Sequence, residues 1–322
     1  MRGRGVAWAA LAVLALVSAS CADIFGLDKD YRLGGTSGTS GAGGPTCAKD
    51  SDCATGPCNV CPKAAPLCLA PLAVGHCKSI SCDTETSATC GPLGTFAVGQ
   101  TPTGIAFDGT NMWVTNQDSN AVTELSPSGA TLGTFPVGPS PAGIAFDGTN
   151  MWVVDNGSNA VTKLSPSGAT LGTFAVGEGP IGIAFDGTNM WVANVDDDDV
   201  SKLSPAGATL GTFTVGSYPY GVAFDGANMW VANVDDGDVI ELSPAGATLG
   251  TFTVGNNPTA IAFDGTNMWV VNSMSGSVTE LSPSGATLGT FPVGTGSMGL
   301  GIAFDGAHMW VVNGSSNSVT EL

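Results

Sequence analysis

Positive charge is what this sequence has least of. Its 322 residues include 9 lysines and arginines against 27 aspartates and glutamates, which gives a formal net charge of −18 at neutral pH. From residue 94 onward the only basic residues are Lys163 and Lys202. Because contacts to nucleic-acid phosphates need lysine and arginine, nucleic acid is excluded as a partner. An anionic membrane surface would also repel this part of the chain, whereas cations and basic partners remain compatible with it.

Side chains that usually carry catalysis are also scarce. The only histidines are His76 and His308, and no cysteine follows Cys90. The chain therefore has no serine–histidine–aspartate set, no cysteine nucleophile in its C-terminal part and no Gly-Lys phosphate loop. Acid–base chemistry by carboxylates alone, such as Glu178, is conceivable, but nothing in the sequence singles one out. We therefore expect a protein that is not an enzyme.

Long apolar runs are limited to one, Val6–Val17, which is too short to cross a bilayer as a helix. It follows a basic start and precedes the small residues Ser18–Ser20, so residues 1–20 are predicted to be a signal peptide. Cys21 comes next, and the whole segment resembles a bacterial lipoprotein signal in which this cysteine is lipidated. Ser18 departs from the usual leucine, and the alternative is an ordinary signal peptide with a stray cysteine. Ala22 resembles the sorting pattern for the outer membrane, so we expect an exported lipoprotein of the cell envelope, with the lipid as its only membrane contact.

Residues 21–46 contain the lipidation site and a Gly/Ser/Thr-rich flexible linker, and residues 47–91 contain a dense set of cysteines. An even number of cysteines in an exported segment with few large apolar residues predicts a disulfide framework. The alternative is a zinc site, for which one Cys-x2-Cys pair is weak support. The eight cysteines are Cys47, Cys53, Cys58, Cys61, Cys68, Cys77, Cys82 and Cys90.

Residues 92–322 consist of a repeat with one tryptophan in each copy. The spacing is 39 residues, and 41 for the last copy; the tryptophans are Trp113, Trp152, Trp191, Trp230, Trp269 and Trp310. Each copy holds four short apolar or alternating runs, here named A to D, with turn residues between them. Four strands leave no room for a helix, and four-stranded units in tandem form propeller blades. We predict an all-β, six-bladed β-propeller; a β-solenoid is the rival array.

The two ends of the repeat region predict how the ring closes. The chain stops after a C run, Ser318–Leu322, whereas a spare D run, Gly94–Val98, precedes the first A run. We predict that this N-terminal strand completes the sixth blade and removes its open edge.

Variation among the copies points to one face of the propeller. The A–B and C–D turns are nearly constant, whereas the B–C and D–A loops vary and should emerge together. The candidate ligand-binding residues on that face are Tyr218, Tyr220 and Glu178. The candidate metal ligands, for calcium, are Asp196, Asp197, Asp198, Asp199, Asp235, Asp236 and Asp238. Their spacing does not fit a calcium loop, and a solvated acidic rim is the simpler interpretation. Six aspartates of the A–B turns suggest a metal-binding ring, although Asp-Gly is a favoured hairpin turn in itself.

The repeat GIAFDGTNMWVTN, followed by VTKLSPSGATLGTF in the next copy, resembles bacterial propeller repeats of the NHL and YVTN families. The enzymes it resembles are the streptogramin (virginiamycin B) lyases, a resemblance that implies a catalytic histidine and glutamate with magnesium. No such residue carries over, because His308 stands in an A–B turn where the other copies have asparagine. We expect a non-enzymatic, monomeric envelope protein without a cofactor, which binds a protein, glycan or cation through its variable loops. The alternatives are a lyase or hydrolase and a purely structural spacer.

Overall fold

The computed structural model describes residues 94–293, 299–314 and 316–322. The predictions for the signal peptide, Cys21, the linker and the eight cysteines concern residues outside these ranges. In the described part nearly all regular structure is β-strand, and the one exception is a single turn of 3-10 helix, η2 (Asn156–Ser158). None of the described segments is a helix with the length and apolar character that a membrane crossing requires.

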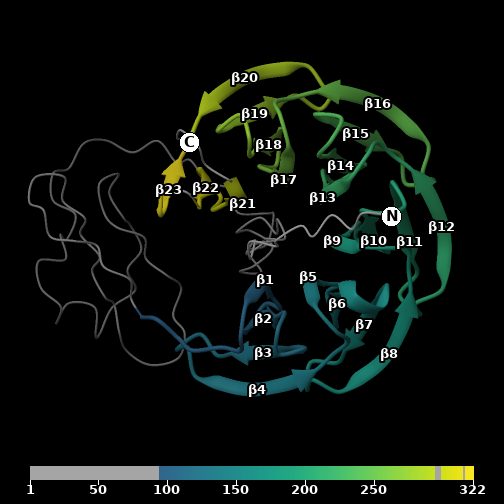
Figure 1. Cartoon of the computed structure of the whole chain (residues 1–322), viewed down its shortest axis with the longest axis vertical. Helices are drawn as coiled ribbons and strands as arrows, with labels where there is room; N and C mark the ends of the chain where they lie inside the picture. The colour runs from purple at the N-terminus through teal and green to yellow at the C-terminus, as the bar shows by residue number, and fades with distance from the viewer. Residues whose placement is uncertain (1–93, 294–298, 315) are drawn as a thin grey trace, which may run out of the picture. The chain divides into compact units, whose positions relative to one another are not determined.

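Six antiparallel sheets follow one another along the chain and around a common axis (Figure 1). Blade 1 contains β1 (Pro102–Phe107), β2 (Met112–Asn116), β3 (Ala121–Leu125) and β4 (Thr131–Pro136). Blade 2 contains β5 (Pro141–Phe146), β6 (Met151–Asp155), β7 (Ala160–Leu164) and β8 (Thr170–Ala175). Blade 3 contains β9 (Pro180–Phe185), β10 (Met190–Asn194), β11 (Asp199–Leu203) and β12 (Thr209–Thr214).

The second half of the propeller continues the same order. Blade 4 contains β13 (Pro219–Phe224), β14 (Met229–Asn233), β15 (Asp238–Leu242) and β16 (Thr248–Thr253). Blade 5 contains β17 (Pro258–Phe263), β18 (Met268–Asn272), β19 (Ser277–Leu281) and β20 (Thr287–Pro292). Blade 6 contains β21 (Gly299–Phe304), β22 (Met309–Asn313) and β23 (Ser318–Glu321). The predicted six-bladed β-propeller is confirmed.

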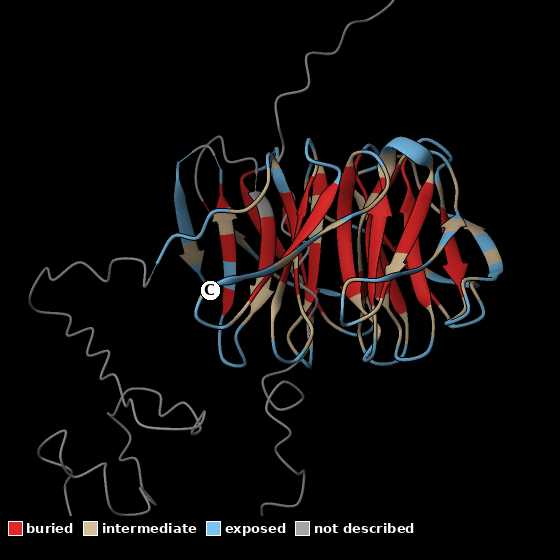
Figure 2. Cartoon of the chain, turned by 90° about the horizontal axis from the view of Figure 1, so that it is seen from below, coloured by how far each residue is buried: buried red, intermediate tan, exposed pale blue. Residues whose placement is uncertain are grey.

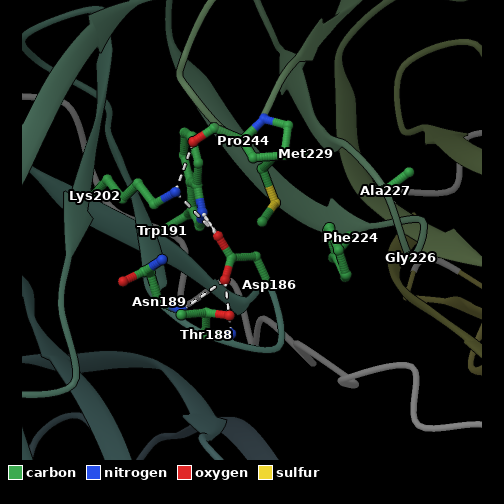
Figure 3. A pocket seen from close by; sticks show the side chains of 10 residues that line it. All are labelled: Asp186, Thr188, Asn189, Trp191, Lys202, Phe224, Gly226, Ala227, Met229 and Pro244. Atoms are coloured by element: carbon green, nitrogen blue, oxygen red, sulfur yellow. Dashed lines mark hydrogen bonds and ion pairs between the residues drawn. The ribbon is translucent and has the colours of Figure 1, made fainter.

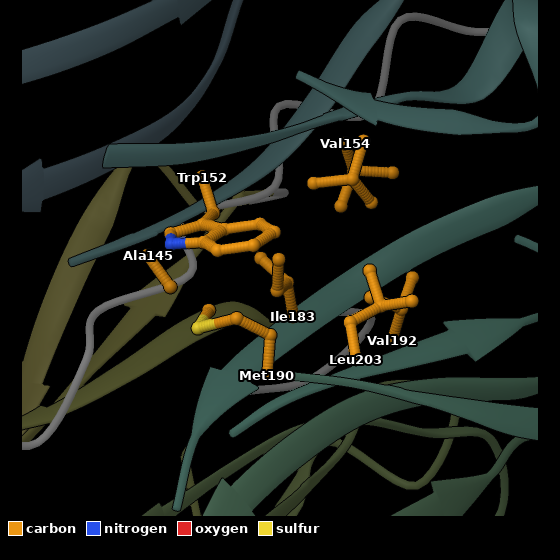
Figure 4. Packing of buried hydrophobic residues seen from close by; sticks show 8 residues of the cluster. Ala145, Trp152, Val154, Ile183, Met190, Val192 and Leu203 are labelled. Atoms are coloured by element: carbon orange, nitrogen blue, oxygen red, sulfur yellow. The ribbon is translucent and has the colours of Figure 1, made fainter. Parts of the chain in front are cut away.

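The core of the propeller lies between consecutive blades. Trp152 of β6, with apolar neighbours from its own blade, packs against Ile183, Met190 and Leu203 of blade 3 (Figure 4). Equivalent clusters fill the other junctions from blade 1 to blade 6. Within each of blades 1 to 5 the tryptophan also contacts the phenylalanine of the outermost strand, with ring centroids 5.4–5.6 Å apart. The tryptophans of blades 1 to 5 are thus structural residues of the core.

Burial follows the position of each strand in its blade. The B and C strands of blades 2 to 5 are buried almost throughout, whereas the outermost D strands are largely exposed, and exposed residues concentrate in the turns and loops (Figure 2). Blade 6 departs from this pattern. Trp310 is 37% exposed and Val319 55%, whereas the other five repeated tryptophans are at most 9% exposed. Blade 6 therefore has a covered side, toward blade 5, and an uncovered one.

The predicted closing strand is not formed. Blade 6 has three strands, and Gly94–Val98 has no strand conformation. The innermost strands β1 and β21 also do not pack together in the way that the other consecutive innermost strands do. In the described part of the chain, β23 is therefore the outermost strand of blade 6.

The N-terminal segment does, however, dock on blade 1 as a D strand would. A Cβ atom added to Gly129, whose φ is +80°, would lie 2.0 Å from the ring of Phe96. Phe135 of β4 covers Gly168 of the next blade with the same 2.0 Å approach. The backbone amide of Gln100 donates to Ser119 Oγ at 2.8 Å, as the corresponding loops of later blades do. The segment thus occupies the outer-strand position beside blade 1 but lacks the partner strand of the blade before it.

Candidate functional site

The turns and loops of the meander separate into two faces. We call the end with the A–B and C–D turns the turn face, and the end with the B–C and D–A loops the loop face. On the loop face, a side chain of the B–C loop in each of blades 1 to 5 accepts a hydrogen bond from the backbone of a neighbouring D–A loop. Asp197 Oδ2 accepts from the Glu178 amide and Asp236 Oδ2 from the Ser217 amide, both at 2.7 Å. The variable loops are therefore held in fixed conformations, which suits them for binding.

Tyr218 joins the loops of blades 3 and 4. It has a φ of +59°, which is rare for a residue with a side chain. Its amide donates to Asp198 Oδ1 of blade 3 at 2.9 Å, and its carbonyl accepts from the Val234 amide of blade 4 at 3.0 Å. Burial raises the pKa of the Tyr218 phenol, and the negative charges of Asp196 and Asp235 raise it further. The backbone of this tyrosine therefore lies between the two acidic loops.

The other members of the predicted sector have different surroundings. Burial raises the pKa of Tyr220 to about 12, with Tyr218 adding to the shift. Asp199 and Asp238 accept hydrogen bonds from Asn194 and Asn233, at 2.6 and 2.7 Å, and burial raises the pKa of each carboxyl. These two carboxylates belong to the frame of their hairpins. Glu178 is exposed and binds the loops through its backbone.

The structure does not gather the acidic residues into a metal site. Among the described residues, no three histidine, cysteine, aspartate or glutamate side chains lie close enough to hold one ion. Five of the seven aspartates that the sequence suggested for calcium accept hydrogen bonds through their side chains from backbone amides or asparagine. These are Asp197, Asp198, Asp199, Asp236 and Asp238. Asp196 and Asp235 are the two whose carboxylates have no such bond to the described part of the chain. The geometry favours two free carboxylates, one in each of the loops that Tyr218 joins, over a calcium cage.

The six aspartates of the A–B turns are structural. In blade 3, Asp186 Oδ1 accepts from the Thr188 and Asn189 amides of its own turn, and Oδ2 accepts from Trp191 Nε1 at 2.7 Å. The other five blades repeat this arrangement with Asp108, Asp147, Asp225, Asp264 and Asp305. Each carboxylate is therefore used to close the turn and orient the buried indole. This agrees with the interpretation of Asp-Gly as turn chemistry.

His308 lies in the turn of blade 6, on the turn face. Its Nδ1 is 3.5 Å from Glu321 Oε1 and 3.9 Å from Asp305 Oδ2, and about half of each of these side chains is exposed. The position therefore puts the one described histidine at the end of the propeller opposite Tyr218. The part of the chain that the structure describes therefore has no histidine on the loop face that could form an acid–base pair.

The contacts of the two lysines were not predicted from the sequence. Lys163 and Lys202 each lie over the tryptophan of their blade, 4.6 Å from the ring centroid, and donate to a proline carbonyl of the next blade. Each also lies 3.3–3.4 Å from its turn aspartate. Although burial opposes ionisation, bonds from Trp191 and the turn amides, with Lys202 beside it, hold the pKa of Asp186 below its usual value. The available signal was that these lysines stand where four other copies have glutamate.

No protein-family model matches the chain, and no curated protein matches it. Solved structures do resemble it. A catalytically inactive histidine-to-alanine variant of virginiamycin B lyase from Staphylococcus aureus, with quinupristin, has a TM-score of 0.61 at 15% identity and covers 69% of this chain and 80% of its own. A streptogramin B lyase has a TM-score of 0.57 at 20% identity, with 68% and 82% covered. A functionally unknown protein from Desulfotomaculum acetoxidans DSM 771 has 0.58 at 16% identity, with 70% and 86% covered. At these identities the likeness establishes the shared propeller fold, and function has to be argued from the residues of this chain.

Proposed function

We propose that this protein is a non-catalytic binding protein of the bacterial envelope, and that its loop face binds a basic segment of a partner protein. The observation that carries the proposal is the position of Tyr218 between the B–C loops of blades 3 and 4, which contain Asp196 and Asp235. Their carboxylates have no hydrogen-bond partner among the described residues, and both side chains are exposed. A lysine or arginine side chain would meet a negative charge on each side and an aromatic ring beneath it.

The rest of the loop face supports the same ligand chemistry. The propeller has only two lysines and no arginine, and both lysines donate to groups of the turn face, so neither forms an ion pair with the carboxylates of the loop face. Tyr218 is held by hydrogen bonds from both blades, so little conformational freedom is lost on binding. The net charge of −18 would also speed the approach of a basic partner.

The envelope location rests on the sequence of the first 46 residues. A signal peptide, lipidation of Cys21 and a flexible linker would place the propeller at the outer membrane, outside the cytoplasm. The disulfide framework of residues 47–91 would then form in an oxidising compartment.

A lyase is the alternative suggested by the solved structures, two of which are named as lyases of streptogramins. The residues argue against it, because His308 lies on the turn face and no other described residue is a histidine. Incubation with quinupristin, followed by chromatography, tests this alternative directly. Any conversion that depends on the protein would overturn the non-catalytic proposal.

The binding proposal is tested by titrating the protein with a fluorescent lysine- and arginine-rich peptide. Each exposed ion pair contributes about 0.2–1 kcal/mol, so Asp196→Asn with Asp235→Asn should weaken binding about tenfold. The control is Asp118→Asn, which removes a charge from the loop face of blade 1, away from the sector. Equal losses in both variants would show that only net charge matters, and the proposed site would be wrong. The same peptide with acetylated lysines and with citrulline in place of arginine should not bind.

A further inference from the structure

A cavity lies on the turn face, between blades 3 and 4. Its volume is about 300 Å³, and both blades line it (Figure 3). Blade 3 contributes Asn189 and Lys202 to one wall. Blade 4 contributes Phe224, Ala227, Met229 and Pro244 to the other. At this size the cavity suits one small ligand, because drug-sized pockets begin at roughly this volume.

Because blade 3 has Lys202 where other blades have glutamate, the side-chain amide of Asn189 lacks its usual partner beside this cavity. In blades with glutamate at this position, the glutamate accepts a hydrogen bond from the turn asparagine, as in the Asn228 Nδ2 to Glu241 Oε1 bond of 2.7 Å. The same bond forms in blades 1 and 5. Lys202 instead turns to Asp186 Oδ2 and to the Pro244 carbonyl, at 3.3 and 2.7 Å. The side-chain amide of Asn189 therefore has no partner in the described part of the chain.

The neighbouring blade supplies the space. The third residue of the A–B turn is threonine in blades 1, 2, 3 and 5, but alanine in blades 4 and 6. Blade 2 also has a lysine, Lys163, but the turn of the blade that follows it has threonine, Thr188. Only between blades 3 and 4 does a lysine precede an alanine. Lys202 leaves the side-chain amide of Asn189 without a partner, and the small side chain of Ala227 leaves space beside it.

The chemistry of the walls restricts the ligand. Lys202 and Asp186 neutralise each other, and the ammonium is already bound to two oxygens and lies over Trp191. A charged ligand would gain little, whereas a neutral one can donate to and accept from the Asn189 amide. Opposite this amide lie Phe224, Met229, Ala227 and Pro244, which offer an apolar surface. A pyranose ring has adjacent hydroxyl groups along its edge and an apolar C–H face.

We propose that this cavity is a second binding site, for a single neutral sugar unit, with Asn189 as its polar anchor and Ala227 as the residue that admits it. A peptide is less suitable because the cavity is confined to residues of blades 3 and 4, and an extended chain needs a groove that continues across more of the surface. The site lies on the opposite face from Tyr218 and is independent of the binding of a basic segment.

The experiment is a titration of the full chain with glucose, galactose, mannose and N-acetylglucosamine, followed through the methionine methyl signals in NMR spectra. Met229 lines the cavity, and Met190 is its buried counterpart between blades 2 and 3. At least one sugar should shift the Met229 signal in a saturable way and leave that of Met190 unchanged. Ala227→Thr should abolish the shift, and Asn189→Ala should weaken binding at least tenfold.

Three controls make the outcome decisive. Asn150→Ala removes the equivalent amide from blade 2 and should change nothing. Lys202→Glu should also abolish binding while the protein stays folded, because it restores the asparagine–glutamate bond that blades 1, 4 and 5 contain. Asp196→Asn with Asp235→Asn should leave the sugar titration intact, which separates this site from the loop face. No shift with any of the sugars, a shift that survives Ala227→Thr, or a shift produced only by N-acetyl amino-acid methylamides would overturn the proposal.

Discussion

Asp155 is a buried carboxylate in a position where the other five blades have asparagine. It ends β6 and has no solvent-exposed surface. Thr162 Oγ1 donates to its Oδ2 at 2.6 Å, and no hydrogen bond of normal geometry reaches its Oδ1. Burial raises the pKa of Asp155 to about 6, although bonds from Thr162 and the Gly138 amide oppose the shift. We predict that Asp155→Asn stabilises the protein at neutral pH.

The magnitude follows from that pKa. Ionising a carboxyl whose folded pKa is about 6, roughly two units above its usual value, costs the folded state about 3 kcal/mol at neutral pH. The asparagine would keep its contacts, since Asn116 and Asn272 donate to the corresponding threonines at 3.0 and 2.9 Å. Asn272 Oδ1 also accepts from the Gly255 amide, the counterpart of Gly138. We expect a gain of about 1–3 kcal/mol in the free energy of unfolding.

The pH dependence of this gain has a definite sign. Below about pH 4 the carboxyl is protonated in both the folded and the unfolded chain, so the substitution should have little effect. Between about pH 4 and 6 the unfolded chain loses the proton while the folded one keeps it, and the native protein loses stability as the pH rises. The advantage of Asp155→Asn should therefore grow over this range and stay constant above it.

Urea unfolding from pH 3.5 to 8 measures the effect. The matched control is Asn116→Asp in blade 1, which places a carboxylate beside Thr123 in an equally buried position. It should destabilise the protein, and more so as the pH rises. A gain from Asp155→Asn that is equal at pH 3.5 and pH 8 would refute the argument from ionisation, and a loss at pH 8 would show that the carboxylate makes an essential contact.

Three other predictions concern different parts of the chain. Glu241→Lys should stabilise blade 4 by about 1 kcal/mol. Burial and the nearby charge of Asp225 raise the pKa of Glu241, whereas a lysine lying over Trp230 would gain an ion pair with Asp225. Urea unfolding measures the change, with Glu241→Met as the uncharged control; an equal loss of stability in both variants would contradict the prediction. Trp310→Phe should remove most of the tryptophan fluorescence that acrylamide quenches, whereas Trp191→Phe should not, since Trp310 is 37% exposed and Trp191 is buried; equal losses would mean that blade 6 is covered. Cys21→Ser should move the protein from the detergent phase to the aqueous phase, and continued partition into detergent would exclude lipidation of this cysteine.

The sequence predicted those contacts that recur within one repeat. The hairpins pair locally, and turn residues such as Asp108 and Gly109 recur at the same place in every copy, so strand order and the two faces could be derived before the structure. The hydrogen bond from Trp113 to Asp108 was missed, although only five residues separate the two. Alternation patterns show which residues are buried, but they do not show which acceptor a buried indole nitrogen finds.

Closure of the ring was the part of the fold that the sequence could not determine. The spare D run predicted a strand at Gly94–Val98, and Phe96 does lie against Gly129 as a D-strand phenylalanine should. Forming the fourth strand of blade 6 requires in addition that β21–β23 pack against blade 1. That packing depends on the sum of small rotations between successive blades, which no single repeat encodes.

Departures from the repeat identify the candidate sites better than the repeat itself does. A residue that is constant in six copies has the same scaffold contact six times, as the turn aspartates show. A lysine at the position of Lys202 and an alanine at the position of Ala227 each occur in one other copy. Only at the junction of blades 3 and 4 do the two occur together, and there the side chain of Asn189 lies beside a cavity without a partner among the described residues. Tyr218 lies in a loop whose ends are fixed by two blades, so its side chain could vary without cost to the fold. In a propeller of nearly identical blades, binding sites are therefore expected where two neighbouring blades both differ from the repeat. Blades 3 and 4 differ in this way on both faces of the propeller.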